Sequence, residues 1–198
     1  MINRNGNIYT IIYALVLAAI VAGVLAWVST SLAPRQAANA DAARNAAIRD
    51  AARLADSSVD SIDVDGLKVY LCISGYDTVR VLPCSGSGLW GPIWGFIALE
   101  NDMTSVRGVS FDHEKETEGL GGQIADSRYH KHFIGRPLIA GKLFRLDIDA
   151  ISGATGTSRA VEDMINECMT SYGAYIDSLR PEGAVIINEE EEVVTDEP

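Results

Sequence analysis

The sequence contains few of the residues that specialised folds require. Three cysteines among 198 residues are too few for a disulfide framework, and no two have the Cys-x-x-Cys spacing of zinc and iron–sulfur sites. The sequence has only 16 basic residues against 27 acidic ones, and it contains no basic stripe. Both features argue against a nucleic-acid partner. Six prolines and 18 glycines exclude a fibrous chain, and 47% hydrophobic residues indicate a globular protein.

Several catalytic and nucleotide-binding motifs are also missing. No Gly-x-Gly-x-x-Gly fingerprint lies on a βαβ unit, so NADH binding is not expected. The run Ser85 to Gly88 lacks the Gly-x-Ser-x-Gly spacing of a nucleophile elbow. Without a visible nucleophile–base pair, a hydrolase is disfavoured.

One long apolar run predicts a membrane span. Residues 8–28 carry no charge, and as a helix they rise about 31 Å, the thickness of the hydrocarbon core. Tyr9, Tyr13 and Trp27 lie towards the ends, where aromatic rings favour the interface. A cleaved signal peptide is the alternative, but its apolar region is usually only about 7–15 residues long. We expect an uncleaved single-pass anchor preceded by a short cytoplasmic tail, residues 1–7.

The flanking charges do not decide the orientation of this anchor. Arg4 precedes the span, whereas Arg35 and Arg44 follow it, partly offset by Asp41. A short tail followed by one span fits a domain held outside the cytoplasm. Residues 29–66 are predicted to form a helical stalk, rich in alanine, and then a polar linker over 56–66. Pro34 marks a joint or the start of a new helix in this segment.

Periodicity predicts an α+β domain over residues 67–181. The helix after Ser158 has apolar residues at three- and four-residue spacing and ends before Pro181. A short helix is expected over 126–134. Residues 182–198 carry seven acids and no base and are expected to be disordered. Strands are predicted at Val69–Ile73, Val79–Leu82, Ile93–Leu99, Val106–Phe111 and Leu143–Ile148.

The segment Asp149 to Ser158 carries the clearest chemistry. It is small, hydroxyl-rich and glycine-containing, and it directly precedes the strongest helix. Unpaired N–H groups and a partial positive charge at a helix N-terminus suit a phosphate. The alternative is that Thr155, Thr157 or Ser158 merely caps the helix, and caps of this kind are common. The residues alone favour the cap.

Two motifs in this chain resemble those of FMN-binding domains in respiratory membrane complexes. Asp149-x-x-Ser152-Gly153-Ala154-Thr155 resembles their flavinylation motif, in which the last threonine is esterified to the phosphate of FMN. Glu116-Thr117-Glu118-Gly119-Leu120-Gly121 is similar to their Glu-Thr-Pro-Gly-Leu-Gly motif. The resemblance implies a covalent phosphoester at Thr155. It also implies that the cofactor-binding or flavinylation residues are Asp149, Ser152, Gly153, Ala154, Thr157, Ser158, Glu116, Thr117, Gly119, Leu120 and Gly121.

The order of these motifs, with the N-terminal span, resembles the C-subunit family of sodium-translocating NADH:quinone oxidoreductases. Leu89-Trp90 after Gly88 favours that family over the related G subunits of Rnf complexes, which stay an alternative. The resemblance implies an electron-relay flavoprotein, also a phosphoprotein through its ester, on the outer side of a bacterial inner membrane. Its implied partners are other membrane subunits, including another flavin subunit, and a flavin transferase for maturation. A membrane-anchored, non-redox module that holds an unlinked anion is the alternative from a different class.

Two positions depart from the family pattern. Glu118 stands where proline is usual, which loosens the loop or changes its turn, and Gly156 stands where a larger apolar residue is common. Trp90 and Trp94 share a spacing that favours core packing, although Trp90 is also a candidate to flank the flavin, as is His113.

The remaining histidines and the cysteines give weaker signals. His130 and His132, with Asp126, are interpreted as surface residues, and no metal site is predicted. A disulfide between Cys72 and Cys84 is left open, and Cys168 is expected in the core.

Overall fold

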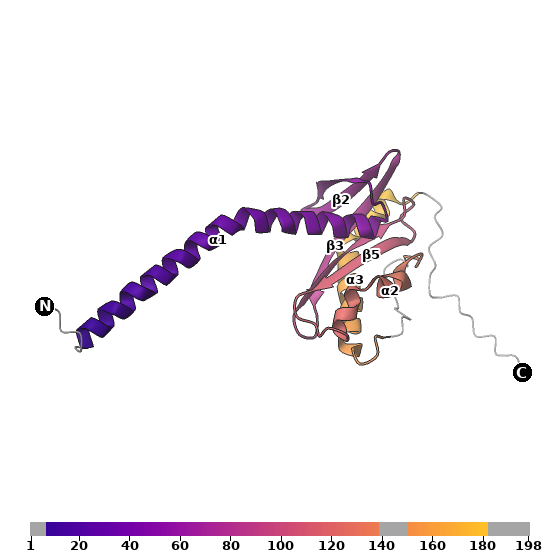
Figure 1. The fold of residues 1–198 in the computed structure, drawn as a ribbon. Helices are drawn as coiled ribbons and strands as arrows, with labels where there is room; N and C mark the ends of the chain where they lie inside the picture. The colour runs from indigo at the N-terminus through magenta and orange to yellow at the C-terminus, as the bar shows by residue number, and fades with distance from the viewer. Residues whose placement is uncertain (1–6, 139–149, 182–198) are drawn as a thin grey trace, which may run out of the picture. The chain divides into compact units, whose positions relative to one another are not determined.

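The computed structural model describes residues 7–138 and 150–181. The chain divides into two compact units, Met1–Arg44 and Asn45–Pro198. The second unit has an α+β fold, in which one antiparallel sheet packs against helix α3 (Thr155–Leu179) (Figure 1). The predicted strand Leu143–Ile148, residue Asp149 and the acidic tail lie outside the described residues.

Helix α1 (Asn7–Ala52) contains the apolar run and the alanine-rich stalk in one continuous element. It is long and apolar enough to cross a membrane, with an 18-residue window of mean hydropathy 2.7 whose side chains are not buried. The prediction of a joint or new helix at Pro34 is wrong, because this residue lies inside α1. Good helix formers surround it, and they offset the hydrogen bond that proline cannot donate.

In the part of the chain that the structure describes, five strands form a sheet in simple chain order, and each is antiparallel to its neighbour. The four strands predicted between residues 69 and 111 are confirmed. The strands are β1 (Ser58–Val64), β2 (Leu67–Ser74), β3 (Asp77–Ser87), β4 (Pro92–Leu99) and β5 (Val106–His113).

The prediction of a polar linker over 56–66 is wrong, because residues 58–64 form β1 and pair with β2. Asp65 (φ 53°) and Gly66 (φ 82°) make the tight turn between these strands, and the Gly66 N–H donates to Asp63 Oδ1 over 3.0 Å. Strand β1 lies at the sheet edge and is mostly exposed, so polar side chains are tolerated along it.

Apolar side chains bury both faces of the sheet. One face packs against α3, and its core includes Leu82, Ile97 and Met164. The other face packs against the end of α1, where Ile48 contacts a cluster that includes Val81. Within the second unit, both faces of the sheet are therefore covered, one by α3 and the other by the end of α1.

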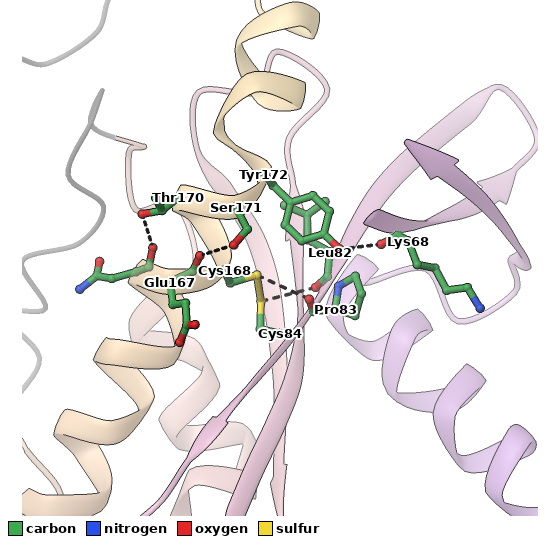
Figure 2. The surroundings of a disulfide bond; sticks show 10 residues. Lys68, Leu82, Pro83, Cys84, Glu167, Cys168, Thr170, Ser171 and Tyr172 are labelled. Carbon is green, nitrogen blue, oxygen red and sulfur yellow. Dashed lines mark hydrogen bonds between the residues drawn. A yellow bond between two sulfur atoms is a disulfide. The ribbon is translucent and has the colours of Figure 1, made fainter. Parts of the chain in front are cut away.

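A disulfide joins Cys84 of β3 to Cys168 of α3, with 5.4 Å between their Cα atoms (Figure 2). Cys72 is a free, buried thiol, so no bridge links it to Cys84. Cys168 lies in the core as expected, but as half of a disulfide. On the same helix, the Tyr172 hydroxyl donates to the Lys68 carbonyl oxygen over 2.7 Å. Two separate contacts therefore fasten α3 to the sheet.

Three short helical segments connect β5 to the rest of the domain, and they confirm the helix predicted over 126–134. They are η1 (Gly121–Ala125), α2 (Ser127–His130) and η2 (Lys131–Phe133). The prediction that His130 is a surface residue is wrong. Its ring is buried, with Nε2 at 2.9 Å from the Ile124 carbonyl oxygen, because α2 folds back against β5. Within the described residues, no three His, Cys, Asp or Glu side chains form a metal cluster.

Burial lowers the pKa of His130 below its ordinary value of 6.5. The unfolded chain therefore takes up this proton first as the pH falls, and the free energy of unfolding should decline below pH 6.5. We expect His130→Gln to reduce that decline, as measured by urea unfolding at about pH 7.5 and about pH 5.5. The matched control is His132→Gln, at an exposed histidine. An unchanged decline in His130→Gln would contradict the prediction.

Candidate functional site

The N-terminus of α3 is left open by its own side chains. Ala154 occupies the N-cap position, no side chain of the described residues hydrogen-bonds there, and the first turn contains no acid. The cap interpretation of Thr155, Thr157 and Ser158 is therefore wrong. Ser158 instead fastens the preceding turn, where its Oγ accepts from the Ile151 N–H and donates to the Ala154 carbonyl oxygen, both over 3.1 Å. A 25-residue helix thus presents free N–H groups and positive potential to an anion.

The two threonines of this turn have different environments. Thr155 is exposed and is the first residue of the helix. Thr157 is 1% exposed, and its hydroxyl donates to Glu116 Oε2 over 2.7 Å. Of the two hydroxyls, only that of Thr155 is accessible to a reagent in solution.

Glu116 points into the protein. Its other oxygen, Oε1, accepts from the Trp90 backbone N–H over 2.8 Å, and its side chain is buried. Burial alone would raise the pKa of Glu116. Hydrogen bonds from Trp90, Thr157 and Leu89, together with the nearby His113, outweigh burial and lower the pKa below 4.5. Glu116 is therefore ionised at neutral pH, and both of its carboxylate oxygens accept hydrogen bonds from other residues of the chain.

Glycines make room for this carboxylate. A Cβ atom on Gly88 would lie 2.5 Å from Glu116 Oε1. On Gly121 it would lie 2.5 Å from Glu116 Oε2 and 2.6 Å from Thr157 Oγ1. These glycines are needed for close approach and not for an unusual φ angle.

Gly121→Ala is therefore expected to destabilise the domain by about 1–3 kcal/mol, since the new methyl group overpacks a buried hydrogen bond. The matched control is Gly173→Ala in the middle of α3, where nothing lies within 4 Å of the added Cβ. That change should stabilise the domain by up to about 1 kcal/mol. Urea unfolding of both variants tests the contrast, and equal effects would contradict it.

Exposed apolar side chains flank the open helix end. Leu89 is 57% exposed and Leu120 is 43% exposed. A Cβ atom on Gly153 would lie 3.1 Å from Leu120 Cδ2, and one on Gly156 would lie 3.3 Å from Leu89 Cδ1. The two leucines therefore lie against the turn that carries Thr155. Leu89 occupies the space that a larger residue at position 156 would take.

The expectation that the two tryptophans pack in the core is wrong. Trp90 is 66% exposed and precedes β4, while Trp94 is 36% exposed and lies within the strand beside buried Ile93 and Gly95. Trp90 is thus available beside Leu89. Trp94 points to the opposite side of β4 from Ile93, because side chains alternate along a strand.

His113 ends β5 and lies against η1. A Cβ atom on Gly122 would come 3.0 Å from His113 Nε2. Its Nδ1 is buried and has no hydrogen-bond partner within the described part of the chain. His113 thus contacts the glycine-rich loop from the side of the sheet.

The structure brings most of the predicted site residues to one place. Ser152, Gly153 and Thr155 are exposed there, as are Thr117 and Gly119 in the facing loop, whereas Glu116, Thr157 and Gly121 form its buried support. Leu89 was missed as a site residue, although the Gly88-Leu89-Trp90 run was the signal for it. The spacing Gly86-x-Gly88-x-x-Gly91 connects two antiparallel strands, so it is not a dinucleotide fingerprint.

Comparison with known proteins agrees with this geometry. Residues 88–170 match the family model of the FMN-binding domain. The C subunit of the Na(+)-translocating NADH-quinone reductase from Haemophilus ducreyi is 37% identical over 102 residues, which cover 45% of this chain and 40% of that protein. Its counterpart from Neisseria meningitidis serogroup A is 30% identical over 119 residues, which cover 52% and 46%. The match thus spans less than half the length of these relatives.

A solved structure shows the same fold. The crystal structure of the C subunit of the Na(+)-translocating NADH-quinone reductase from Parabacteroides distasonis superposes with a TM-score of 0.51 at 27% identity, and covers 55% of this chain and 62% of that one. Residues 88–170 are therefore similar to the FMN-binding domain, and the chain is similar over part of its length to C subunits of Na(+)-translocating NADH-quinone reductases.

Proposed function

We propose that this chain is an electron-relay subunit that carries FMN, esterified through its phosphate to Thr155, in a sodium-translocating NADH:quinone oxidoreductase. One observation carries the proposal. Thr155 is exposed at a helix N-terminus that no described side chain caps, and the apolar side chains of Leu89 and Leu120 lie against its turn. The match to the FMN-binding domain supports the identity of the ligand.

The residues present fit both ends of FMN. The free N–H groups and positive potential of α3 suit the phosphate, and they meet no acidic side chain in the first turn. Exposed Leu89, Trp90 and Leu120 offer apolar surface to a flat ring. Bound FMN supplies the capacity to accept and release electrons. The chain's own residues position the cofactor and exclude water from one side of it.

The ester requires help from outside the chain. A threonine hydroxyl is a weak nucleophile, and no described side chain hydrogen-bonds to that of Thr155. We therefore assign activation to a separate flavin transferase, which reaches Thr155 because this residue is exposed.

The domain is proposed to lie on the periplasmic side of the inner membrane. Helix α1 supplies one apolar segment long enough to anchor it. The Cys84–Cys168 disulfide supports an oxidising compartment, because structural disulfides are rare in the cytoplasm. The electron partners are then other membrane subunits of the same complex, including another flavin subunit.

In-gel flavin fluorescence of native-host membranes tests the cofactor proposal. After full denaturation, the band of this chain should fluoresce and its intact mass should exceed the sequence mass by one FMN ester. A dark band, in membranes where other flavinylated proteins fluoresce, would overturn the proposal and favour a non-redox anion-binding module. Co-purified subunits would then identify the complex, whether sodium-translocating reductase or Rnf.

A further inference from the structure

We propose that Glu116 is a positioning residue: its buried carboxylate joins three separate segments of the flavin site and places a fixed negative charge beneath them. This inference rests on the function proposed above. It assigns to Glu116 a role inside the protein, distinct from contact with the cofactor.

The first segment is the turn 88–91. The Gly88 N–H donates to the Gly91 carbonyl oxygen over 2.8 Å, which closes the turn. Glu116 Oε1 then accepts the Trp90 N–H over 2.8 Å. This turn carries the exposed side chains of Leu89 and Trp90, so the carboxylate fixes their positions.

The second segment is the first turn of α3. Glu116 Oε2 accepts a hydrogen bond from the Thr157 hydroxyl over 2.7 Å. The two residues are 41 positions apart in sequence. Thr157 is two residues beyond Thr155 on the same helix. The acceptor threonine is thus tied to the turn 88–91 through one side chain.

The third segment is the loop 116–121, to which Glu116 itself belongs. Gly121 lies against both Glu116 Oε2 and Thr157 Oγ1, with no room for a side chain. Leu120, directly before it, faces Gly153 on the far side of the turn. The contacts of one carboxylate therefore determine the spacing between Leu89, Leu120 and Thr155.

The negative charge of Glu116 acts on the flavin as well. Its oxygens stay ionised above pH 4.5 because three hydrogen bonds and His113 favour the charged form. A fixed negative charge disfavours the further negative charge that a flavin gains on reduction. Glu116 therefore holds the reduction potential of a flavin at this site below the value it would have without the charge.

Redox titration of the purified, flavinylated full chain tests the charge. Glu116→Gln, which keeps the shape and an acceptor oxygen, should shift the flavin midpoint potential to a more positive value. The matched control is Glu114→Gln, which removes an exposed carboxylate two residues away, and it should leave the potential unchanged. A bright gel band with the same potential in wild type and Glu116→Gln overturns the inference. A dark wild-type band overturns the proposed function instead.

Hydrogen exchange tests the mechanical link without any flavin. Among the described hydrogen bonds, those of Glu116 join Thr157 to the turn 88–91. Thr157→Val should therefore speed amide exchange within 88–91, up to roughly tenfold, whereas Thr157→Ser keeps the hydroxyl and should preserve wild-type exchange. Unchanged exchange in Thr157→Val overturns the positioning role, and it does so even where Glu116→Gln fails to fold.

Discussion

Thr155→Val is expected to abolish covalent flavin altogether. Valine is nearly isosteric with threonine and removes only the hydroxyl that the ester requires. Because Thr155 is exposed and makes no hydrogen bond within the described residues, the change should leave the fold and its stability almost untouched. The flavin band in a denaturing gel should disappear while the amount of chain in the membrane stays constant.

Two controls define this result. Thr155→Ser retains a hydroxyl at the same place and should retain at least part of the flavin. Thr170→Val makes the same chemical change further along α3, at an exposed threonine whose hydroxyl donates to the Asn166 carbonyl oxygen, and should stay fully flavinylated. A bright Thr155→Val band would contradict the assignment. Thr157 would not readily replace Thr155, since its hydroxyl is buried against Glu116.

Loss of the Cys84–Cys168 disulfide should produce the largest change in stability. The bond closes a loop of 84 residues. The chain-entropy model assigns about 4.5 kcal/mol to a loop of that length, and measured values for native disulfides are about 2–5 kcal/mol. Reductant should therefore lower the urea midpoint of the wild-type chain strongly.

The double variant Cys84→Ser with Cys168→Ser supplies the control. It should show a similarly low midpoint and no further response to reductant, because the remaining thiol of Cys72 is free in the wild type as well. A wild-type urea midpoint that is the same before and after full reduction of the disulfide would contradict the prediction. The proposed flavin ester should survive reduction, because thiol reductants attack disulfide sulfur and do not break a phosphate ester.

The sequence predicted the elements that bury apolar side chains. The strands between 69 and 111 are short apolar runs between turn residues, and helix α3 has apolar residues at three- and four-residue spacing. Strand β1 was not predicted, because it is an exposed edge strand whose polar sequence resembles that of a linker. The continuity of α1 through Pro34 was not predicted, because proline weakens a helix without always ending it.

The disulfide partner required the register of the sheet. Cys72 lies opposite Val79 on the neighbouring strand, so these two side chains share a face. Cys84 is an odd number of residues beyond Val79 and therefore points to the other face, where α3 lies. No property of the two cysteines alone contains this information.

The position of Glu116 could not be predicted for a related reason. An acid in a glycine-rich loop suggests contact with a ligand, yet this one is enclosed by a turn and a helix from distant parts of the chain. Burial of a charge depends on partners that only the assembled fold brings together. The structure places this loop beside the turn of Thr155, and the direction of the Glu116 side chain came from the tertiary structure.

The order of the strands has a consequence for how the domain folds. Every strand within the described residues pairs with its immediate neighbour in sequence, so this part of the sheet grows by adding one hairpin after another. Synthesis proceeds from the N-terminus, and α3 is the last described element. The sheet can thus assemble before the helix that covers it has been made. Docking of α3 then completes the core and brings Cys168 to Cys84, so the proposed acceptor Thr155 reaches its final place only in this last step.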